Sequence, residues 1–172
     1  MPARRVYLSL GSNLGDREGH LRTALDELGT GGVDIEAVSG VYETPPWGVE
    51  DQPPFLNIAV AAVTELDPHE LLALAKRVEA AAGRDFDAPR WTARPLDIDL
   101  VLIEGESVQT PDLTVPHPLM QERAFVLVPL GEIAGDAIHP RLRRSVRELR
   151  DARPGAERTT VRRVRAAGWY PA

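Results

Sequence analysis

Residues 55–66 are apolar on both alternating faces over most of their length, with a single amide, Asn57, near the start. Side chains of a strand point alternately to its two faces, so a strand that is apolar on both needs hydrophobic cover on both. The run therefore predicts a central strand in a sheet that is covered on both sides.

The patterns around this run predict further strands and helices in mixed order. Asp67, Pro68 and Glu70 form the start of a capped helix, which Gly83 ends. Short connections and split βαβ units favour an α+β fold of ferredoxin-like type with a mostly antiparallel sheet. The predicted strands are 5–10, 33–42, 55–66 and 96–103, with a short return strand after 105–106; the predicted helices are one carrying Leu14, Leu21, Leu25 and Leu28, then 68–82, 125–134 and a short one in the arginine-rich end.

Length and charge limit the classes of protein that this chain can represent. With 172 residues, 43% of them hydrophobic and none of them cysteine, the chain predicts one globular domain over 1–172 without disulfides or thiolate sites. Residues 141–172, taken as part of that domain, carry ten arginines against three acidic residues, whereas the rest is strongly acidic. An acidic body argues against nucleic acid as the main partner. No targeting or membrane segment is visible, so a cytoplasmic monomer is expected.

Asp97 and Asp99 are the strongest chemical signal. Residues two apart on a strand share a face, so these carboxylates project together, whereas Leu96, Ile98, Leu100 and Leu102 are expected to face the core. Two adjacent carboxylates repel each other unless a cation lies between them, and Mg²⁺ prefers such hard oxygen ligands. An exposed strand face with two unrelated acids is the alternative interpretation.

Arginines lie close to this acidic pair in the sequence. Arg84, Arg90 and Arg94 precede it in a polar loop, and His117 and Arg123 follow it. Arginine forks beside a divalent cation make a site for polyphosphate, although simple salt bridges would leave the same pattern. Gly83 at the base of the loop suggests a lid that closes over the ligand.

Aromatic residues and one amide predict a slot for a flat heterocycle. Tyr42 to Gly48 (YETPPWG) and Phe55 supply aromatic faces and exposed backbone. Asn57 interrupts an otherwise apolar strand and offers both a donor and an acceptor, which suits a lactam-like ring edge. Ordinary core packing is the alternative for Phe55.

Taken together, these segments resemble the 6-hydroxymethyl-7,8-dihydropterin pyrophosphokinase family of folate biosynthesis. The matching segments are LSLGSNLGD, YETPPWG, DQPPFLN, GR at 83–84, RWTARPLDIDL and TVPHPLMQERAFVLVPL, spread in order over residues 7–130. The resemblance implies a three-layer α/β/α fold of ferredoxin-like descent. It also implies an Mg²⁺-dependent enzyme that transfers pyrophosphate from ATP to the pterin hydroxymethyl group and releases AMP.

The resemblance also implies roles for individual residues. Asp97 and Asp99 correspond to ligands of two Mg²⁺ ions. Arg84, Arg94 and Asp97 are the implied catalytic residues, with Asp97 a candidate for helping the hydroxyl to lose its proton. The implied ATP-binding residues are Lys76, Glu79, Arg94, His117 and Arg123. The implied pterin-binding residues are Thr44, Pro45, Trp47, Phe55, Asn57 and Phe125, with the two phenylalanines placed to sandwich the ring.

The chain departs from the family pattern in the arginine loop. Phe86 stands where the family carries a second arginine, and Arg90 could compensate for the missing charge. A different two-metal phosphotransferase is one alternative, because a fold does not determine a function. A non-catalytic ferredoxin-like module that binds nucleotide or RNA through its basic end is another, but it leaves the acidic pair unexplained.

Overall fold

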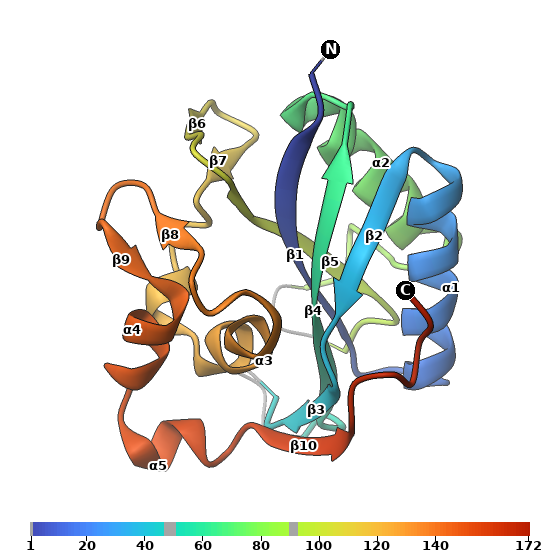
Figure 1. Cartoon of the computed structure of the whole chain (residues 1–172). Helices are drawn as coiled ribbons and strands as arrows, with labels where there is room; N and C mark the ends of the chain where they lie inside the picture. The colour runs from blue at the N-terminus through green and yellow to red at the C-terminus, as the bar shows by residue number, and fades with distance from the viewer. Residues whose placement is uncertain (1, 47–50, 90–92) are drawn as a thin grey trace.

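The long apolar run is strand β4 (Phe55–Thr64), and it lies inside a six-stranded sheet of order β10-β3-β4-β1-β5 in which β2 also pairs with β4 (Figure 1). The structure, a computed structural model, describes residues 2–46, 51–89 and 93–172. β1 (Arg4–Ser12) and β5 (Asp97–Ile103) complete one side of the sheet. Every pairing in the described sheet is antiparallel, as predicted.

Helices cover both faces of this sheet, which confirms the predicted three-layer α+β architecture (Figure 1). α1 (Arg17–Thr30) and α2 (Pro68–Ala81) pack on one face, and α3 (Ala124–Ala134) packs with α4 (Val146–Asp151) on the other. The two faces of β4 enter different cores: Ile58, Val60 and Ala62 enter the α1–α2 core, and Ala59 and Ala61 enter the α3–α4 core. Burial on both sides is the physical reason for its apolar sequence after Asn57.

Two helix starts differ in how well the sequence predicted them. α2 begins with the predicted capping box, in which Asp67 accepts from the Glu70 amide and Glu70 accepts from the Asp67 amide. α1 begins one residue after Asp16, whose carboxylate accepts from the Gly19 amide. Leu14 precedes the helix and is 47% exposed, so the prediction that it lies on the helical stripe is wrong.

Residues 33–42 form two strands rather than the one predicted. β2 (Val33–Val38) and β3 (Val41–Thr44) both pair with β4. Ser39 and Gly40 belong to neither strand and separate the two. A Cβ on Gly40 would lie 2.5 Å from the Arg165 carbonyl oxygen, so glycine permits the close approach of the C-terminal segment.

β5 contains a bulge that the alternating pattern did not predict. Leu8 pairs with Leu100 and Tyr7 pairs with Leu102, so Val101 is the extra residue. Leu102 consequently lies in the α3–α4 core, not with Ile98 and Leu100 as expected. The face that carries the acidic pair is unaffected, because the bulge comes after it.

The segment after β5 contains several short strands and helices in addition to α3 and α4. A turn follows β5 as predicted, but the strand after it, β6 (Val108–Gln109), pairs with β7 (Thr114–Val115) in a separate two-stranded sheet. A 3₁₀ turn, η1 (Met120–Glu122), leads into α3. A hairpin of β8 (Ile138–His139) and β9 (Arg144–Ser145) precedes α4, and α5 (Gly155–Arg158) follows it.

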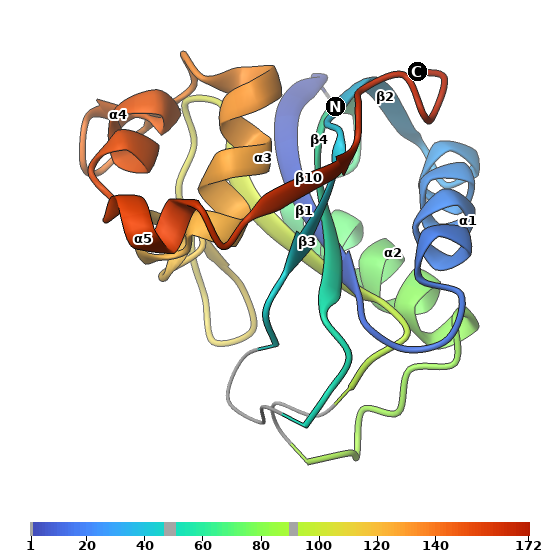
Figure 2. The same cartoon turned by 90° about the horizontal axis from the view of Figure 1, so that it is seen from below.

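The arginine-rich end contains a strand that sequence reasoning missed. β10 (Arg162–Arg165) pairs with β3 at the sheet edge, and Figure 2 shows it running from the side of α5 to that of α1. Trp169 then packs into the α1–α2 core and donates its Nε1 hydrogen to the Ser39 carbonyl at 2.8 Å. Within the described residues, no helix has both the length and the apolar character needed to cross a membrane.

Candidate active site

The acidic pair lies at the start of β5, beside β1. Gly11 is paired with Asp97 and Ser9 with Asp99, so both carboxylates share the α3 face of the sheet, as the spacing predicted. Both are half-buried. Burial, reinforced by the neighbouring Asp97 charge and opposed by Arg123, raises the pKa of Asp99 to about 7. An ionised Asp99 is therefore unfavourable in its buried surroundings, and a bound cation would compensate its charge.

Two arginines of the polar loop reach Asp97. Arg84 Nη1 lies 2.8 Å from Asp97 Oδ1, and Arg94 Nη1 lies 3.4 Å from the same oxygen. Both arginine side chains are largely buried. In the ligand-free chain these cations thus hold one carboxylate of the pair, and they line the same cavity as that carboxylate.

Glu79 of α2 holds the Arg84 side chain beside Asp97. Its carboxylate is fully buried; Oε2 accepts from the Arg84 guanidinium and from the Ile98 amide at 2.8 Å. Lys76 Nζ lies 3.5 Å from Oε1. Burial raises the pKa of Glu79, against the Ile98 and Arg84 contacts that lower it. Glu79 does not line the cavity but holds Arg84, which does, and its predicted part in ATP binding stays a prediction.

His117 is held in a defined orientation beside the acidic pair. Its backbone amide donates to the carbonyl of the bulged Val101 at 2.9 Å, and its Nδ1 accepts from the Leu119 amide at 3.2 Å. Burial, together with the Arg123 charge, lowers the pKa of His117 to about 4. The ring is therefore neutral at pH 7 with its proton on Nε2, which makes that nitrogen a donor toward an anion.

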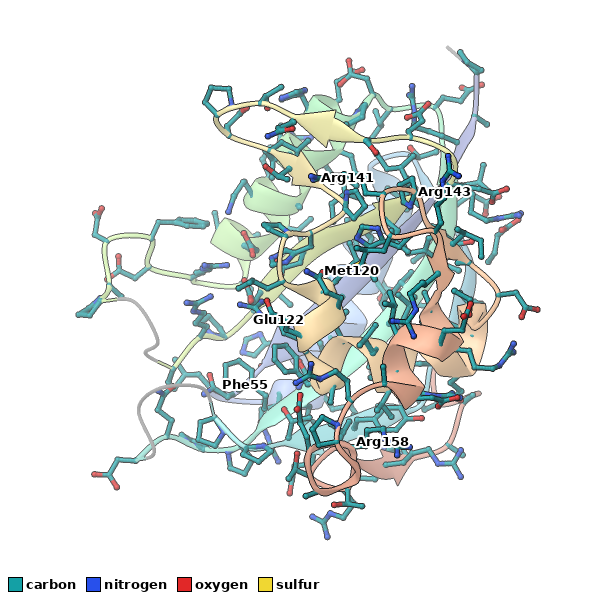
Figure 3. All side chains as sticks on the ribbon, turned by 90° about the vertical axis from the view of Figure 1, so that its left-hand side faces the viewer. Phe55, Met120, Glu122, Arg141, Arg143 and Arg158 are labelled. Atoms are coloured by element: carbon teal, nitrogen blue, oxygen red, sulfur yellow. The ribbon has the colours of Figure 1, made fainter. Side chains whose placement is uncertain are left out.

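Asn57, predicted to bind a flat ring, lies across β1 from the acidic pair, because Gly11 pairs with Asn57 on one side and with Asp97 on the other. Asn57 is buried, and its Nδ2 donates to Thr44 Oγ1 at 2.6 Å. Gly11 faces it across the strands: a Cβ there would lie 2.7 Å from Asn57 Oδ1. Phe55 and Phe125 line the same cavity, and Arg123 lies 5.5 Å from the Phe125 ring centroid. Figure 3 labels Phe55 in the view of this side of the molecule, together with Met120 and Glu122 of η1.

One cavity of about 250 Å³ joins these groups. It is lined by most of the predicted site residues, namely Thr44, Pro45, Phe55, Asn57, Lys76, Arg84, Arg94, Asp97, Asp99, His117, Arg123 and Phe125, together with Ser9 and Gly11. Trp47, predicted to bind the ring, lies outside the described residues, as does Arg90. The cavity thus brings anion-binding side chains, two carboxylates and an aromatic slot together.

Asn13 is a buried polar residue that sequence reasoning placed only in a turn. Its Oδ1 accepts from the Arg94 amide at 2.7 Å, and its Nδ2 donates to Gln52 Oε1 at 3.1 Å and to the Pro53 carbonyl at 3.2 Å. Asn13 therefore ties the start of β5 to the loop before β4. A polar residue just after an apolar strand was the available signal, but its partners are distant in sequence.

Residues 7–135 match the family model described as 7,8-dihydro-6-hydroxymethylpterin-pyrophosphokinase. The chain belongs to this family. Family membership confirms the prediction of an enzyme that transfers a pyrophosphoryl group in folate biosynthesis, and it does not favour the RNA-binding alternative.

Curated relatives of the family agree. The 2-amino-4-hydroxy-6-hydroxymethyldihydropteridine pyrophosphokinase of Methylorubrum extorquens is 50% identical over 135 residues, covering 78% of this chain and 85% of the relative. The protein of the same name from Bacillus subtilis is 48% identical over 129 residues, covering 74% of this chain and 77% of the relative. A mitochondrial folate synthesis bifunctional protein of Arabidopsis thaliana is 43% identical over 133 residues, which are 24% of its length.

Solved structures support the fold. A structure described as HPPK-DHPS in complex with substrates matches with a TM-score of 0.69 at 16% identity, covering 88% of this chain and 43% of that one. A Plasmodium falciparum HPPK-DHPS structure matches with a TM-score of 0.68 at 16% identity, covering 87% of this chain and 45% of that one. This chain thus spans less than half of those longer chains, and the likeness concerns the family fold alone.

Proposed function

We propose that this cavity transfers pyrophosphate from ATP to the hydroxymethyl group of 6-hydroxymethyl-7,8-dihydropterin and releases AMP. The observation that carries the proposal is the shared cavity: the acidic pair Asp97 and Asp99 lines it together with cationic side chains and a slot with a buried amide. A phosphate-binding half and a ring-binding half would thereby place donor and acceptor beside each other.

The acidic pair fits a divalent metal site. Both carboxylates share one strand face, and burial raises the pKa of Asp99, so negative charge there is unfavourable without a cation. Two Mg²⁺ ions held by Asp97 and Asp99 would neutralise the phosphates and polarise the β-phosphate. Arg84 and Arg94, which hold Asp97 in the ligand-free chain, would turn their forks toward the phosphates.

The remaining cavity residues divide between the two substrates. His117 would donate its Nε2 hydrogen to a phosphate oxygen, with Arg123 and Lys76 supplying charge beside the nucleotide. Phe55 and Phe125 would sandwich the pterin, with Asn57, Thr44, Pro45 and the undescribed Trp47 at its rim. The pterin hydroxyl oxygen then attacks the β-phosphorus, and the bond between that phosphorus and the oxygen that bridges it to the α-phosphate breaks. AMP leaves with the bridging oxygen, and the hydroxyl proton passes to Asp97 or to water.

An AMP-release assay with ATP, Mg²⁺ and the hydroxymethyl pterin tests this function. Formation of AMP and of the pterin diphosphate in equal amounts, with dependence on all three components and loss on chelation, is expected. Phosphorus NMR identifies the products. Release of ADP instead of AMP would contradict pyrophosphoryl transfer, and full activity after chelation would contradict the metal site.

A further inference from the structure

Phe86 is an aromatic residue with an unusual degree of exposure in the loop after α2. Its side chain is 49% exposed, and no hydrophobic core of the described residues contains it. A single exposed apolar side chain needs no explanation by itself. The position of this ring relative to two cations of the cavity is what requires one.

Two cations lie over the Phe86 ring. The Arg84 Cζ atom is 5.0 Å from the ring centroid, and the Lys76 Nζ atom is 5.4 Å from it. Both distances are within the range in which an aromatic quadrupole attracts a cation. Both cations also line the cavity that contains the acidic pair. Phe86, which lies outside the cavity, thus contacts Arg84 and Lys76, two cations that line it.

The backbone holds the ring in this place. Gly83 ends α2 with a φ of +92°, and the Arg84 amide donates to the Glu79 carbonyl at 3.2 Å. Asp85 Oδ1 accepts from the Asp87 amide at 2.9 Å, which closes a turn around Phe86. The loop therefore leaves the helix in a set direction and presents residue 86 toward α2.

The two contacts on Arg84 are complementary. Arg84 Nη1 donates to both the Glu79 and the Asp97 carboxylates, whereas the Arg84 Cζ atom lies over the Phe86 ring. A guanidinium stacked on a ring keeps its fork of donors available to a phosphate. Lys76, by contrast, has a flexible stem and is half-exposed, so an aromatic neighbour restricts it more.

A second arginine–aromatic pair with the same spacing borders the cavity. Arg123 and Phe125 are also two residues apart, with the Arg123 Cζ atom 5.5 Å from the ring centroid. Arg84 and Phe86 have the same spacing and a similar distance, but Phe125 lines the cavity whereas Phe86 lies outside it.

We propose that Phe86 is a positioning residue that acts as an aromatic platform for Arg84 and Lys76, so that both cations are pre-oriented for the phosphates of ATP. The proposal rests on the proposed function of the cavity. At this loop position the chain thus carries an aromatic ring that orients two charges instead of supplying a third.

The alternative is that Phe86 only packs the loop. It borders a shallow hollow of about 400 Å³ together with Leu14, Pro89 and Pro95. Leucine would preserve that apolar contact but has no quadrupole, whereas tryptophan provides a stronger one. Phe86→Leu and Phe86→Trp therefore separate the platform from simple packing.

The experiment measures three quantities for the full chain of each variant. They are the Kd of a non-hydrolysable ATP analogue with Mg²⁺ by calorimetry, kcat for AMP release, and the Arg84 Nε–H resonance by NMR. Phe86→Leu is expected to raise Kd and lower kcat, each by about two- to fivefold. It should also remove the ring-current shift of the Arg84 resonance. Phe86→Trp should remain close to the wild type.

Lys76→Met provides the background that separates the two cations. In it, Phe86→Leu should no longer change Kd but should still lower kcat, because only the contact to Arg84 remains. Leu142→Ala, at the exposed tip of the distant β8–β9 hairpin, is the control and should change none of the three quantities.

Specific results would overturn the platform. Kd and kcat unchanged in Phe86→Leu, or equal losses in Phe86→Leu and Phe86→Trp, would leave Phe86 as loop packing. If the wild type released no AMP, the proposed function would fail. The Kd of inorganic tripolyphosphate with Mg²⁺, compared between the wild type and Phe86→Leu, would then decide the platform independently.

Discussion

At the scale of single residues, the site combines groups whose protonation its surroundings alter in different directions. Burial raises the pKa of Asp99 to about 7 and lowers that of His117 to about 4. In both cases desolvation favours the neutral form. Arg123 acts on both groups, stabilising a carboxylate and disfavouring an imidazolium. A cation bound at the acidic pair would therefore stabilise the ionised carboxylates. An anion bound near His117 and Arg123 would find a hydrogen-bond donor and a positive charge.

Asp99→Asn is expected to lower turnover by at least about 10²–10³-fold, because it removes one metal-holding charge. Without ligand, the variant should be as stable as the wild type or more stable at pH 8, since it removes a buried charge beside Asp97. AMP release at saturating Mg²⁺ and urea unfolding check the two statements. Asp136→Asn, an exposed carboxylate in an ion pair far from the cavity, is the control. Near-normal turnover in Asp99→Asn would refute the metal assignment.

Asn57→Ala is expected to weaken pterin binding by about 1–3 kcal/mol, roughly five- to 150-fold, and to leave ATP binding nearly intact. The amide is buried with one donor already given to Thr44, so its remaining groups are those that can read a ring edge. Thr44→Val, which removes that partner and frees the amide to rotate, should give a smaller loss. Calorimetry with each ligand separately measures both effects, and an equal loss of ATP affinity would show that Asn57 is structural.

His117 makes stability depend on pH in a defined direction. The unfolded residue has a pKa near 6.5 and the folded one near 4, so between these values the unfolded chain binds a proton that the folded chain does not. Stability from this group is complete above about pH 6.5 and falls as pH decreases toward 4. His117→Asn keeps an acceptor for the Leu119 amide but cannot titrate.

Urea unfolding of both proteins from pH 7.5 to 4.5 checks this. The wild type should lose stability relative to His117→Asn as the pH falls. His139, whose pKa burial also lowers, is present in both proteins and cancels in the difference. A difference that stays constant over this range would be inconsistent with a neutral, desolvated His117.

At the scale of elements, the loop after α2 connects the phosphate side of the cavity to the sheet. Arg84 stands at its start and Arg94 near its end, and both hold Asp97. Arg94 is fixed further, because Asn13 accepts from its amide and donates to its carbonyl. Among the described residues, the Arg84 backbone bonds to Glu79 of α2 and not to β1. Closure of the loop should therefore change the surroundings of Arg84 more than those of Arg94.

Arg84→Ala is therefore expected to lower kcat far more than it weakens ATP binding, whereas Arg94→Ala should affect both. Single-turnover kinetics and equilibrium ATP binding separate the two quantities. Arg84→Lys keeps the charge that compensates the buried Glu79, so it reports on the fork without unfolding the site. Arg141→Ala, in the exposed β8–β9 hairpin, is the control. A defect of Arg84→Ala in affinity alone would make Arg84 a ground-state clamp and exclude the lid.

At the scale of the whole molecule, the arginine-rich end, residues 141–172, runs along the α3 side of the sheet and then along the sheet edge formed by β3. This segment is called the strap below. Figure 3 shows Arg141 and Arg143 at one end of the α3 side and Arg158 at the other. The strap then crosses the sheet edge: Arg162 pairs with Glu43 and Arg165 with Glu18. Because β3 carries Thr44 at its end, the strap also covers the strand that leads into the ring-binding slot.

Trp169→Ala is expected to lower the free energy of unfolding by about 3–5 kcal/mol, because it empties a core position and removes the hydrogen bond to Ser39. Unfolding should remain a single transition if residues 1–172 form one domain. Val164→Ala, at an exposed position of β10, should change stability by less than about 0.5 kcal/mol. Urea denaturation followed by circular dichroism measures both. A second transition would separate residues 141–172 from the domain.

The sequence by itself determined the features that depend on local periodicity. The two-faced run of β4, the capping box of α2 and the two-residue spacing of Asp97 and Asp99 follow from strand and helix geometry, which neighbouring residues are sufficient to specify. The assignment of most cavity residues came from motifs in a known order, and the structure brings them into one cavity.

Only the tertiary structure decided the features that depend on partners distant in sequence. The bulge at Val101 moved Leu102 to the other core, and Gly40 split a predicted strand because Arg165 passes close to it. β10 has a charged, exposed sequence that predicts no strand, yet β3 offers it an open edge. The sequence predicts only a turn at Asn13, whereas its side chain bonds to Arg94 and to the loop before β4. In each case the energy comes from contacts that local sequence patterns do not contain.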